Sequence, residues 1–470
     1  MHETVDVVVI GAGIAGLSAA YDLGARATTL RVLDQASTPG GVLQTERLGD
    51  WVIDRGPDSF LLQKPSAVEL CAELGLASQL ISTQQPRTSY VLRDGSLHPL
   101  AEGSFLGFPL SLKALATSSL FRIAGKARMA AEVFIPRRDW QDEDDESIGA
   151  FVKRRFGREA ADYLAEPLLA GIHAGDVDDL SVRVLFPRLV ETERRHGSIL
   201  RAFRALKPTR SDRGAFASLV GGVGTLVEAL VARLPAGTLV PDTRATSVRR
   251  DDEGHGYLVS TTDGSWQARA VVLAVPAYEA ATLVAGLDGQ LATACSAIRY
   301  ASTATVALGY RAEQVPHPLR GTGFVVPRAE GSALLAATWV TSKWPGRAPT
   351  GHVLLRAFFG GGRDPHRLDR HDDAELVALA REEFGAILGA TGEPVLARTT
   401  RWVRQSPQYS VGHADRLAAI ERRLHAHAGL FGTGSGFGAI GIPDCISHGR
   451  RVASHVTSFL QSSSHRMGPP

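Results

Sequence analysis

A glycine-rich pattern near the start of the chain constrains the fold more than any other feature. Residues 5–10 (VDVVVI) form a β-branched run typical of a buried parallel strand, and residues 17–23 continue with helical periodicity. Between them, residues 11–16 read Gly-x-Gly-x-x-Gly. In this context the first glycine permits a tight turn, the second lets a pyrophosphate approach the backbone, and the third lets helix pack on strand. The pattern predicts a dinucleotide-binding fold, with free N–H groups at the helix start for the phosphates. The alternative is a glycine-rich structural turn.

An acidic residue follows the second predicted strand. Residues 29–33 are expected to form this strand, and Asp34 comes 18 residues after Gly16. This spacing is close to that of the acid that binds ribose hydroxyls in dinucleotide-binding folds. The fingerprint alone does not separate NAD from FAD. The sequence of Asp34, Gly40-Gly41 and Thr45 resembles the extended FAD motif of the flavin amine oxidase superfamily, where glutamate is usual at the position of Asp34.

The composition narrows the class of protein. The chain has 470 residues, 44% of them hydrophobic and 21% charged, as expected for a globular protein with a large core. Its net charge of +2 argues against nucleic acid as a partner. Cys71, Cys295 and Cys445 are far apart, so we expect neither a disulfide framework nor a metal site. We recognise no signal peptide and no spanning apolar stretch, and we expect a cytoplasmic protein.

Periodicity divides the chain into three expected parts. The predicted class is α/β: a discontinuous, Rossmann-like FAD-binding domain, a mixed-sheet substrate-binding domain and a helical subdomain. The stretch 110–135 mixes apolar and basic residues and could lie on a membrane surface, but covering a core is the favoured interpretation. The expected boundaries are 1–85, 216–300 and 395–462 for the FAD-binding domain, 86–107 and 301–394 for the substrate-binding domain, and 108–215 for the helical subdomain.

Four further segments carry a more specific resemblance. GPDSF at residues 56–60, GIHAGD at 171–176, PQY and GH within 407–413, and GIPDCI at 441–446 are similar, in the same order, to motifs of the oxygen-dependent porphyrinogen oxidases of haem synthesis. Within that branch, the chain resembles the coproporphyrinogen III oxidases of the Gram-positive type more than the protoporphyrinogen oxidases. The segments that favour this choice are 89–100, 157–171, 321–327, 338–345 and 351–358.

This resemblance implies an activity. The expected reaction is the FAD-dependent oxidation of coproporphyrinogen III to coproporphyrin III in haem b biosynthesis, with O2 as oxidant and hydrogen peroxide as by-product. Oxidation of protoporphyrinogen IX is the alternative. An amine oxidase, a carotenoid desaturase and a non-catalytic flavin-binding or porphyrin-binding protein are further alternatives. Amine oxidases usually link flavin through a cysteine in the last glycine-rich loop, and residues 432–438 contain none, so non-covalent FAD is expected. Contact with a ferrochelatase and peripheral attachment to the inner face of the membrane stay open.

The resemblance also implies a set of FAD contacts. The last helix is expected to begin near Ile442, where its positive dipole end would face the negative charge of reduced flavin. Three positions depart from the usual pattern: His173 replaces Tyr, Phe437 replaces a frequent Tyr, and Ala439 replaces Gly. The implied FAD contacts are Gly11, Ala12, Gly13, Ile14, Ala15, Gly16, Asp34, Gln35, Val42, Gly56, Pro57, Asp58, Ser59, Val248, Trp402, Ile440, Gly441 and Ile442.

Few residues are candidates for contact with the substrate. No nucleophile or acid–base set is assigned, because the flavin does the redox chemistry. Asp58 is a candidate for orienting a pyrrole N–H, since a carboxylate accepts hydrogen bonds. Lys64, and after it Arg87, are candidates for binding the substrate's propionates. His173 and His413 are predicted to be hydrogen-bonded structural histidines rather than acid–base groups.

Overall fold

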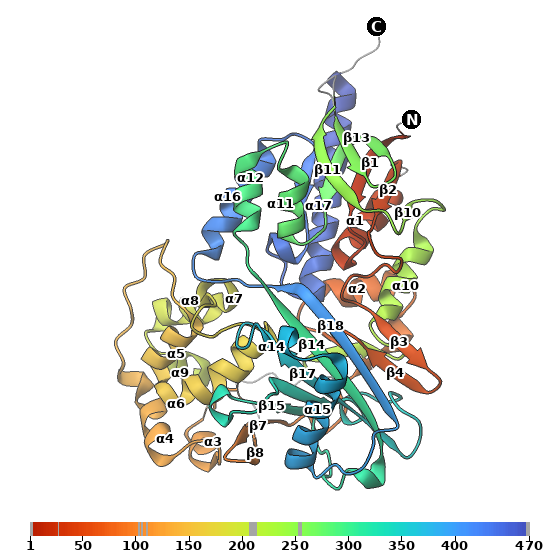
Figure 1. Ribbon diagram of the computed structural model, residues 1–470. Helices are drawn as coiled ribbons and strands as arrows, with labels where there is room; N and C mark the ends of the chain where they lie inside the picture. Colours follow the sequence, from red (N-terminus) through yellow and green to blue (C-terminus); the bar gives the residue numbers. More distant parts are fainter. Residues whose placement is uncertain are drawn as a thin grey trace.

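The computed structural model describes residues 3–26, 28–101, 104, 107–109, 111–205, 214–251 and 256–466. Parts of the expected substrate-binding and helical regions, namely residues 102, 103, 105, 106, 110 and 206–213, lie outside the described residues. The molecule contains two large sheets, one in the upper and one in the lower half of Figure 1, and a group of helices beside the second sheet. The expected α/β architecture is confirmed.

The first sheet contains the dinucleotide-binding strands. The chain enters at its centre because β1 (Glu3–Ile10) has Val7, Val8 and Val9 fully buried, which requires cover on both faces. The order is β10-β2-β1-β13-β12-β11, and β19 pairs with β13. The five strands other than β11 and β12 run parallel. Their bounds are β2 Leu30–Leu33, β10 Leu239–Val240, β11 Ala245–Arg250, β12 Tyr257–Thr261, β13 Ser265–Leu273 and β19 Leu430–Gly432.

Helices from both ends of the chain cover one face of this sheet. Figure 1 shows α1 (Ile14–Gly24) beside α17 (Ile442–Arg466), and these two helices pack against each other. Their contact is close because Gly449 of α17 lies against the backbone of Ala15. The remaining helices of this half are α2 Ser66–Glu73, α10 Gly224–Arg233, α11 Ala277–Val284, α12 Gly289–Ser296 and α16 His413–His425.

The second sheet is mixed, as expected. Its order is β18-β14-β17-β16-β15-β7-β8, and β7 pairs with β15 in parallel. The expected hairpin turn is present at Asp94-Gly95, both with positive φ. Helix α15 (Asp373–Leu388) packs its buried face, which includes Leu376 and Phe384, into the core of this half. The strands are β7 Ser89–Arg93, β8 Ser96–Pro99, β14 Tyr300–Arg311, β15 Gly323–Val325, β16 Ala336–Trp339, β17 His352–Gly360 and β18 Leu396–Pro407.

One expected boundary differs from the structure. We assigned residues from 395 onward to the FAD-binding domain, but β18 pairs with β14 from Leu396 to Pro407 and belongs to the second sheet. The reason is that β14 has β17 on one side only, so its other edge needs a partner. Strand β18 crosses the middle of the molecule in Figure 1.

The helical region is built around its own core. Phe151, Phe156 and Leu164 are among its buried side chains. Within residues 111–135 Leu115, Leu120, Phe121 and Met129 pack inward, whereas Leu112, Ile123 and Phe134 are exposed. Among the described residues, no helix combines the length and the apolar character that crossing a membrane requires. The elements are α3 Leu112–Thr117, α4 Ile123–Ala130, η2 Ala131–Phe134, α5 Ile148–Phe156, α6 Arg158–Ala160, the π-helix η3 Ala161–Ala170, α7 Val182–Leu185, α8 Pro187–His196 and α9 Ile199–Ala205.

Short elements join these parts. Strands β3 and β4 form a two-stranded sheet, and β5, β9 and β6 form a three-stranded one. Their bounds are β3 Thr45–Leu48, β4 Trp51–Asp54, β5 Phe60–Leu61, β6 Leu80–Ser82 and β9 Phe216–Leu219. The short helices are η1 Ala77–Gln79, η4 Ala312–Gln314, η5 Arg328–Glu330, α13 Val340–Lys343, α14 Arg367–Arg370 and η6 Ser435–Phe437.

Candidate functional site: a cavity between the two ends of the chain

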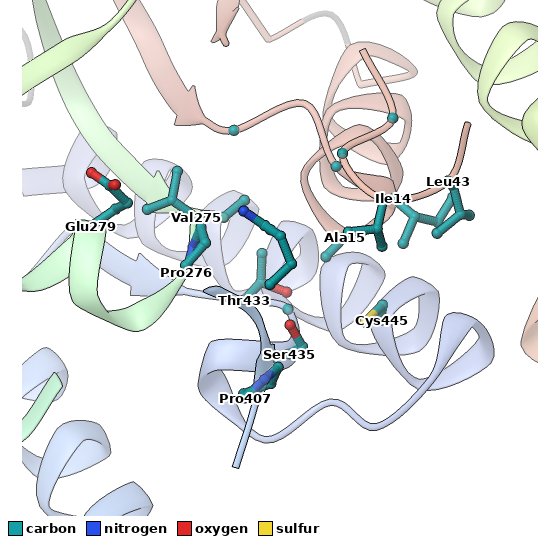
Figure 2. A pocket seen from close by; sticks show the side chains of 18 of the residues that line it. Ile14, Ala15, Leu43, Val275, Pro276, Glu279, Pro407, Thr433, Ser435 and Cys445 are labelled. Carbon is teal, nitrogen blue, oxygen red and sulfur yellow. The ribbon is translucent and has the colours of Figure 1, made fainter. Parts of the chain in front are cut away.

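A cavity of about 540 Å³ lies beyond the carboxyl ends of the parallel strands. Its wall includes Gly11 after β1, Asp34 after β2, Ala274 after β13 and Thr433 after β19. Ligands of doubly wound sheets bind at this edge, and the volume is typical of a cofactor site. Figure 2 shows side chains from both ends of the chain around it, with Ile14 and Ala15 on one side and Thr433, Ser435 and Cys445 on another.

The three glycines of the fingerprint have different surroundings. Gly11 has φ +107°, and a Cβ there would lie 2.5 Å from the carbonyl oxygen of Ala274. A Cβ on Gly16 would lie 2.0 Å from the carbonyl oxygen of Gly11. Gly13 lines the cavity, and a Cβ on it would meet nothing within 4 Å. The first and third glycines are therefore required by the fold, while the second keeps space open at the start of α1. No side chain caps this helix start, so its N–H groups are available to an anion.

Asp34 is held at the cavity by two backbone hydrogen bonds. Its Oδ2 accepts from the N–H of Ala12 at 2.6 Å, and its Oδ1 accepts from the N–H of Ala36 at 2.8 Å. Each carboxylate oxygen has a further lone pair for a ligand hydroxyl. Gln35 lines the same end of the cavity. Asp34 has a shorter side chain than the usual glutamate, and the N–H groups of Ala12 and Ala36 fix its position.

Val248 is one of the predicted contacts that do not line the cavity; the others are Ala12, Gly16, Gly56, Asp58 and Ser59. Val248 is fully buried in β11, where it pairs with Val259. The cavity is instead lined by Thr243, Arg244 and Ala245, at the start of that strand. The expected contact of Val248 is a backbone contact with adenine, so a side chain packed in the core is compatible with it, and the contact stays a prediction.

The other end of the cavity, which we call the ring end, is formed by segments from three regions. Val42, Pro57 and Trp402 line it, together with residues 440–442 at the start of α17. The indole Nε1 of Trp402 donates to the carbonyl oxygen of Arg55 at 3.0 Å. A Cβ on Gly56 would lie 2.1 Å from the carbonyl oxygen of Val42, so the turn needs glycine there. Helix α17 begins at Ile442, as predicted.

Asp58 lies behind the cavity wall. Its carboxylate is 3.0 Å from Nζ of Lys343 and 3.2 Å from Nη2 of Arg356, and it accepts from the indole of Trp344 at 3.3 Å. Burial alone would raise the pKa of Asp58, but Lys343 and Arg356 outweigh it and hold that pKa well below its usual range. Ser59 donates to the same carboxylate at 2.8 Å. The structure therefore puts Asp58 in an ion cluster rather than where a pyrrole-orienting acid is needed.

The two candidate propionate-binding cations do not line the cavity. Nζ of Lys64 pairs with Oδ2 of Asp444 at 2.5 Å, and Asp444 lies in the first turn of α17. Lys64 is therefore beside the ring end and half-exposed. The guanidinium of Arg87 donates to the carbonyl oxygen of Thr83 at 3.0 Å. The structure does not bring Lys64 and Arg87 together.

The two histidines do not fit the prediction of hydrogen-bonded structural residues. His173 lines the cavity, and its imidazole has no hydrogen bond to any described residue. His413 is fully buried, its ring nitrogens have no hydrogen-bond partner among the described residues, and its ring lies 4.4 Å from that of Tyr409. Burial lowers the pKa of each to about 4. Aromatic packing, which sequence patterns do not show, takes the place of hydrogen bonds.

Sequence reasoning missed several residues of the wall. Val275 and Pro276 follow β13, the parallel neighbour of β1, so the strand pattern could have indicated them. Tyr278 and Tyr300 reach the cavity from separate elements, and no local pattern marks them, whereas Tyr409 belongs to the PQY motif. Ala439 and Cys445 also line the wall near the start of α17.

One protein family matches nearly the whole of this chain. The family described as flavin containing amine oxidoreductase matches residues 14–457, nearly the whole chain. The chain belongs to this family. It is therefore an oxidoreductase with a flavin cofactor, and the cavity has the glycines, the helix N-terminus and the acid that a flavin dinucleotide requires.

The relatives described here match this chain over most of their length. The coproporphyrinogen III oxidase of Bacillus subtilis is 34% identical, over 97% of this chain and 98% of the relative. The chloroplastic protoporphyrinogen oxidase of Nicotiana tabacum is 29% identical, over 98% of this chain and 87% of the relative. A crystal structure described as a protoporphyrinogen oxidase from Exiguobacterium sp. 255-15 has TM-score 0.86 and 29% identity, over 98% of this chain and 99% of that one. A crystal structure of putrescine oxidase has TM-score 0.71 and 16% identity, over 97% of this chain and 100% of that one, and shares the fold.

Proposed function

We propose that this chain oxidises coproporphyrinogen III to coproporphyrin III, with FAD as cofactor and O2 as oxidant, and releases hydrogen peroxide. The observation that carries the proposal is the cavity built jointly by the N-terminal glycine turn and the start of α17. It occurs in a chain that matches a coproporphyrinogen III oxidase from end to end at 34% identity. We place the reaction in the cytoplasm.

FAD is bound without a covalent link in this proposal. The N–H groups at the start of α1 would hold the pyrophosphate, Asp34 the ribose, and residues 440–442 the flavin ring. FAD held there would supply the two-electron redox chemistry between the porphyrinogen and O2. Cys445 is on α17, not in the loop 432–438, and its Sγ lies 3.7 Å from the carbonyl oxygen of Ala439. Burial, with Asp444 nearby, raises the pKa of this thiol to about 12, which disfavours the reactive thiolate.

The charges behind the ring end favour a substrate rich in carboxylates. Lys343, Arg347 and Arg356 surround Asp54 and Asp58, so three cations face two carboxylates in this cluster. A surplus positive charge beside Pro57, in a wall of low dielectric, attracts anions into the cavity. Coproporphyrinogen III has four propionates and protoporphyrinogen IX has two. Protoporphyrinogen IX stays the second candidate, because relatives named for it share the whole fold.

The substrate assignment is tested by steady-state kinetics of the purified protein. We expect kcat/KM for coproporphyrinogen III to exceed that for protoporphyrinogen IX by at least about tenfold, measured in air by the appearance of porphyrin fluorescence. Putrescine serves as the amine control and should yield no hydrogen peroxide. A preference for protoporphyrinogen IX would show that protoporphyrinogen IX, and not coproporphyrinogen III, is the substrate. Turnover of putrescine alone would show that the protein is an amine oxidase.

A further inference from the structure

One imidazole at the ring end keeps its hydrogen-bonding capacity for a ligand. His173 follows the π-helix η3 and lines the cavity beside Ile172. The imidazole of His173 contacts the ring of Phe186 edge to face, with centroids 6.2 Å apart, and has no hydrogen bond to any described residue. A neutral imidazole has one donor and one acceptor nitrogen, and both need a partner once a bound substrate displaces water from the cavity. The geometry therefore indicates a partner that arrives with the substrate.

The backbone that carries His173 is held in place on two sides. Nε2 of Gln408 donates to the carbonyl oxygen of His173 at 3.2 Å, and the N–H of Gly362 donates to the carbonyl oxygen of Ala174 at 2.7 Å. Ala174 has φ +48°, a left-handed conformation that costs a non-glycine residue free energy. Such strain persists only where surrounding contacts impose it. The side chain is thus presented to the cavity from a fixed position.

Two other protonatable groups of the cavity wall, Tyr409 and Cys445, already have partners within the protein. The hydroxyl of Tyr409 donates to the carbonyl oxygen of Ser435 at 2.6 Å, and the thiol of Cys445 lies 3.7 Å from the carbonyl oxygen of Ala439. Asp34 lies at the opposite end of the cavity, tied to backbone N–H groups. Among the described residues that line the ring end, His173 is the basic side chain with an unoccupied acceptor.

The proposed reaction needs a proton acceptor. Oxidation of a porphyrinogen removes hydrogens from the meso carbons and also from pyrrole nitrogens. When a meso carbon loses its hydride to bound flavin, the adjacent pyrrole N–H becomes iminium-like and acidic. Resting on the proposed function, we propose that His173 accepts this proton. The pyrrole N–H bond breaks, its electron pair stays on the pyrrole nitrogen, and the proton binds a ring nitrogen of His173.

The surroundings of His173 suit repeated turnover. Ile172, next to it, is 69% exposed, so solvent reaches this part of the wall and can take the proton away. Burial keeps the imidazole neutral at pH 7, with its acceptor nitrogen free before each round. A weak base is sufficient because the iminium-like donor is a strong acid.

The test compares His173→Gln and His173→Ala with the wild-type holoenzyme. We expect kcat for coproporphyrinogen III to fall about 100-fold in both, the range of general base catalysis. The dissociation constant of the stable product coproporphyrin III, measured by fluorescence, should change less than about threefold. Added imidazole should raise kcat of His173→Ala at least tenfold, since it fits the vacated space, and should leave His173→Gln unchanged.

The controls separate this role from packing and from the proposed function. His366→Gln, an exposed site outside the cavity, should behave as wild type. Wild-type kcat in His173→Gln would overturn the proposal. A second result would also overturn it: in His173→Ala, kcat falls, added imidazole does not restore it, and the dissociation constant of coproporphyrin III rises by the same factor. That result would show that His173 only packs against its neighbours. A wild-type protein that oxidises no porphyrinogen would instead contradict the function on which the proposal rests.

Discussion

At the scale of single residues, two glycines of one motif separate cofactor binding from folding. Gly13 has extended backbone angles open to any residue, and a methyl group there would project into free space. We expect Gly13→Ala to keep the free energy of unfolding of the apoprotein within about 0.5 kcal/mol. The methyl would occupy the space where a pyrophosphate must approach, so FAD affinity should fall at least tenfold, as measured by flavin fluorescence on dilution.

Gly16→Ala is the matched variant with the opposite expectation. Its Cβ would lie 2.0 Å from the carbonyl oxygen of Gly11, so helix and strand must move apart. We expect the apoprotein to lose about 1–3 kcal/mol of unfolding free energy, measured by urea titration. Equal stability of the two variants would contradict the roles assigned to these glycines.

Substitution of Lys64 tests whether this residue binds a propionate of the substrate. Lys64 is half-exposed and paired with Asp444 beside the ring end, so Lys64→Met should raise KM for coproporphyrinogen III several-fold and leave kcat nearly unchanged. Asp444→Asn breaks the same ion pair and leaves the cation, so it should not raise KM. A rise in KM in both variants would mean that the ion pair, and not a propionate contact, is what matters.

Residue identities show how far the sequence could predict the site. The glycine turn, Asp34 after β2 and the start of α17 depend on local patterns of strand, turn and helix, and the structure has these elements where the patterns predict them. Their contacts with FAD stay predictions. The surroundings of Asp58 were not anticipated, because they depend on cations such as Lys343, which lies 285 positions away in sequence. The burial of Val248 depends on which way a strand face points. Single-sequence patterns do not report such distant partners.

At the scale of elements, the turn after β4 is joined to α13 and β17 by the ion cluster of Asp58. The guanidinium of Arg356 donates to the carbonyl oxygens of Asp54 and Gly56 at 2.7 and 2.9 Å and also faces Asp58. Removing the carboxylate charge leaves buried cations uncompensated. We expect Asp58→Asn to cost about 3–5 kcal/mol at pH 7, measured by urea unfolding.

The same variant makes a signed prediction about pH. The folded-state pKa of Asp58 is lower than its unfolded value near 4, so its stabilisation is fully present above pH 4 and is lost as the pH falls through the folded pKa. The difference in unfolding free energy between wild type and Asp58→Asn should therefore shrink on going from pH 7 to pH 3. A difference that grows on acidification would contradict the ion cluster.

Sequence periodicity predicted most of the helices and strands named below, but it assigned one strand to the wrong sheet. The hairpin at Asp94-Gly95, the helix 373–388 and the long C-terminal helix were expected and are present. Strand β18 was assigned to the wrong part, because the choice of sheet depends on the free edge of β14, which is visible only in three dimensions.

At the scale of the whole molecule, the two ends of the chain meet at one helix pair. A Cβ on Gly449 of α17 would lie 2.2 Å from the carbonyl oxygen of Ala15 in α1, next to the cavity. We expect Gly449→Ala to separate the helices, lower the apoprotein Tm by several degrees and weaken FAD binding, because both walls of the cofactor cavity move. Thermal unfolding with and without added FAD measures both effects.

Gly385→Ala is the matched control for that substitution. Gly385 lies in α15 of the other half, where a Cβ would make an ordinary contact at 3.5 Å. Alanine favours helix over glycine, so this variant should be as stable as wild type or slightly more stable, with unchanged FAD affinity. A loss of flavin from Gly385→Ala alone would contradict the location of the site.

The central claim is that a flavin held between the two ends of this chain is reduced by a porphyrinogen. Anaerobic titration of the purified, FAD-loaded protein with coproporphyrinogen III, followed by absorbance, tests it directly. We predict that the oxidised flavin band disappears, and that admitting O2 restores it while coproporphyrin accumulates. A flavin band that persists through excess coproporphyrinogen III and protoporphyrinogen IX, or a protein that cannot be loaded with FAD, would contradict the account.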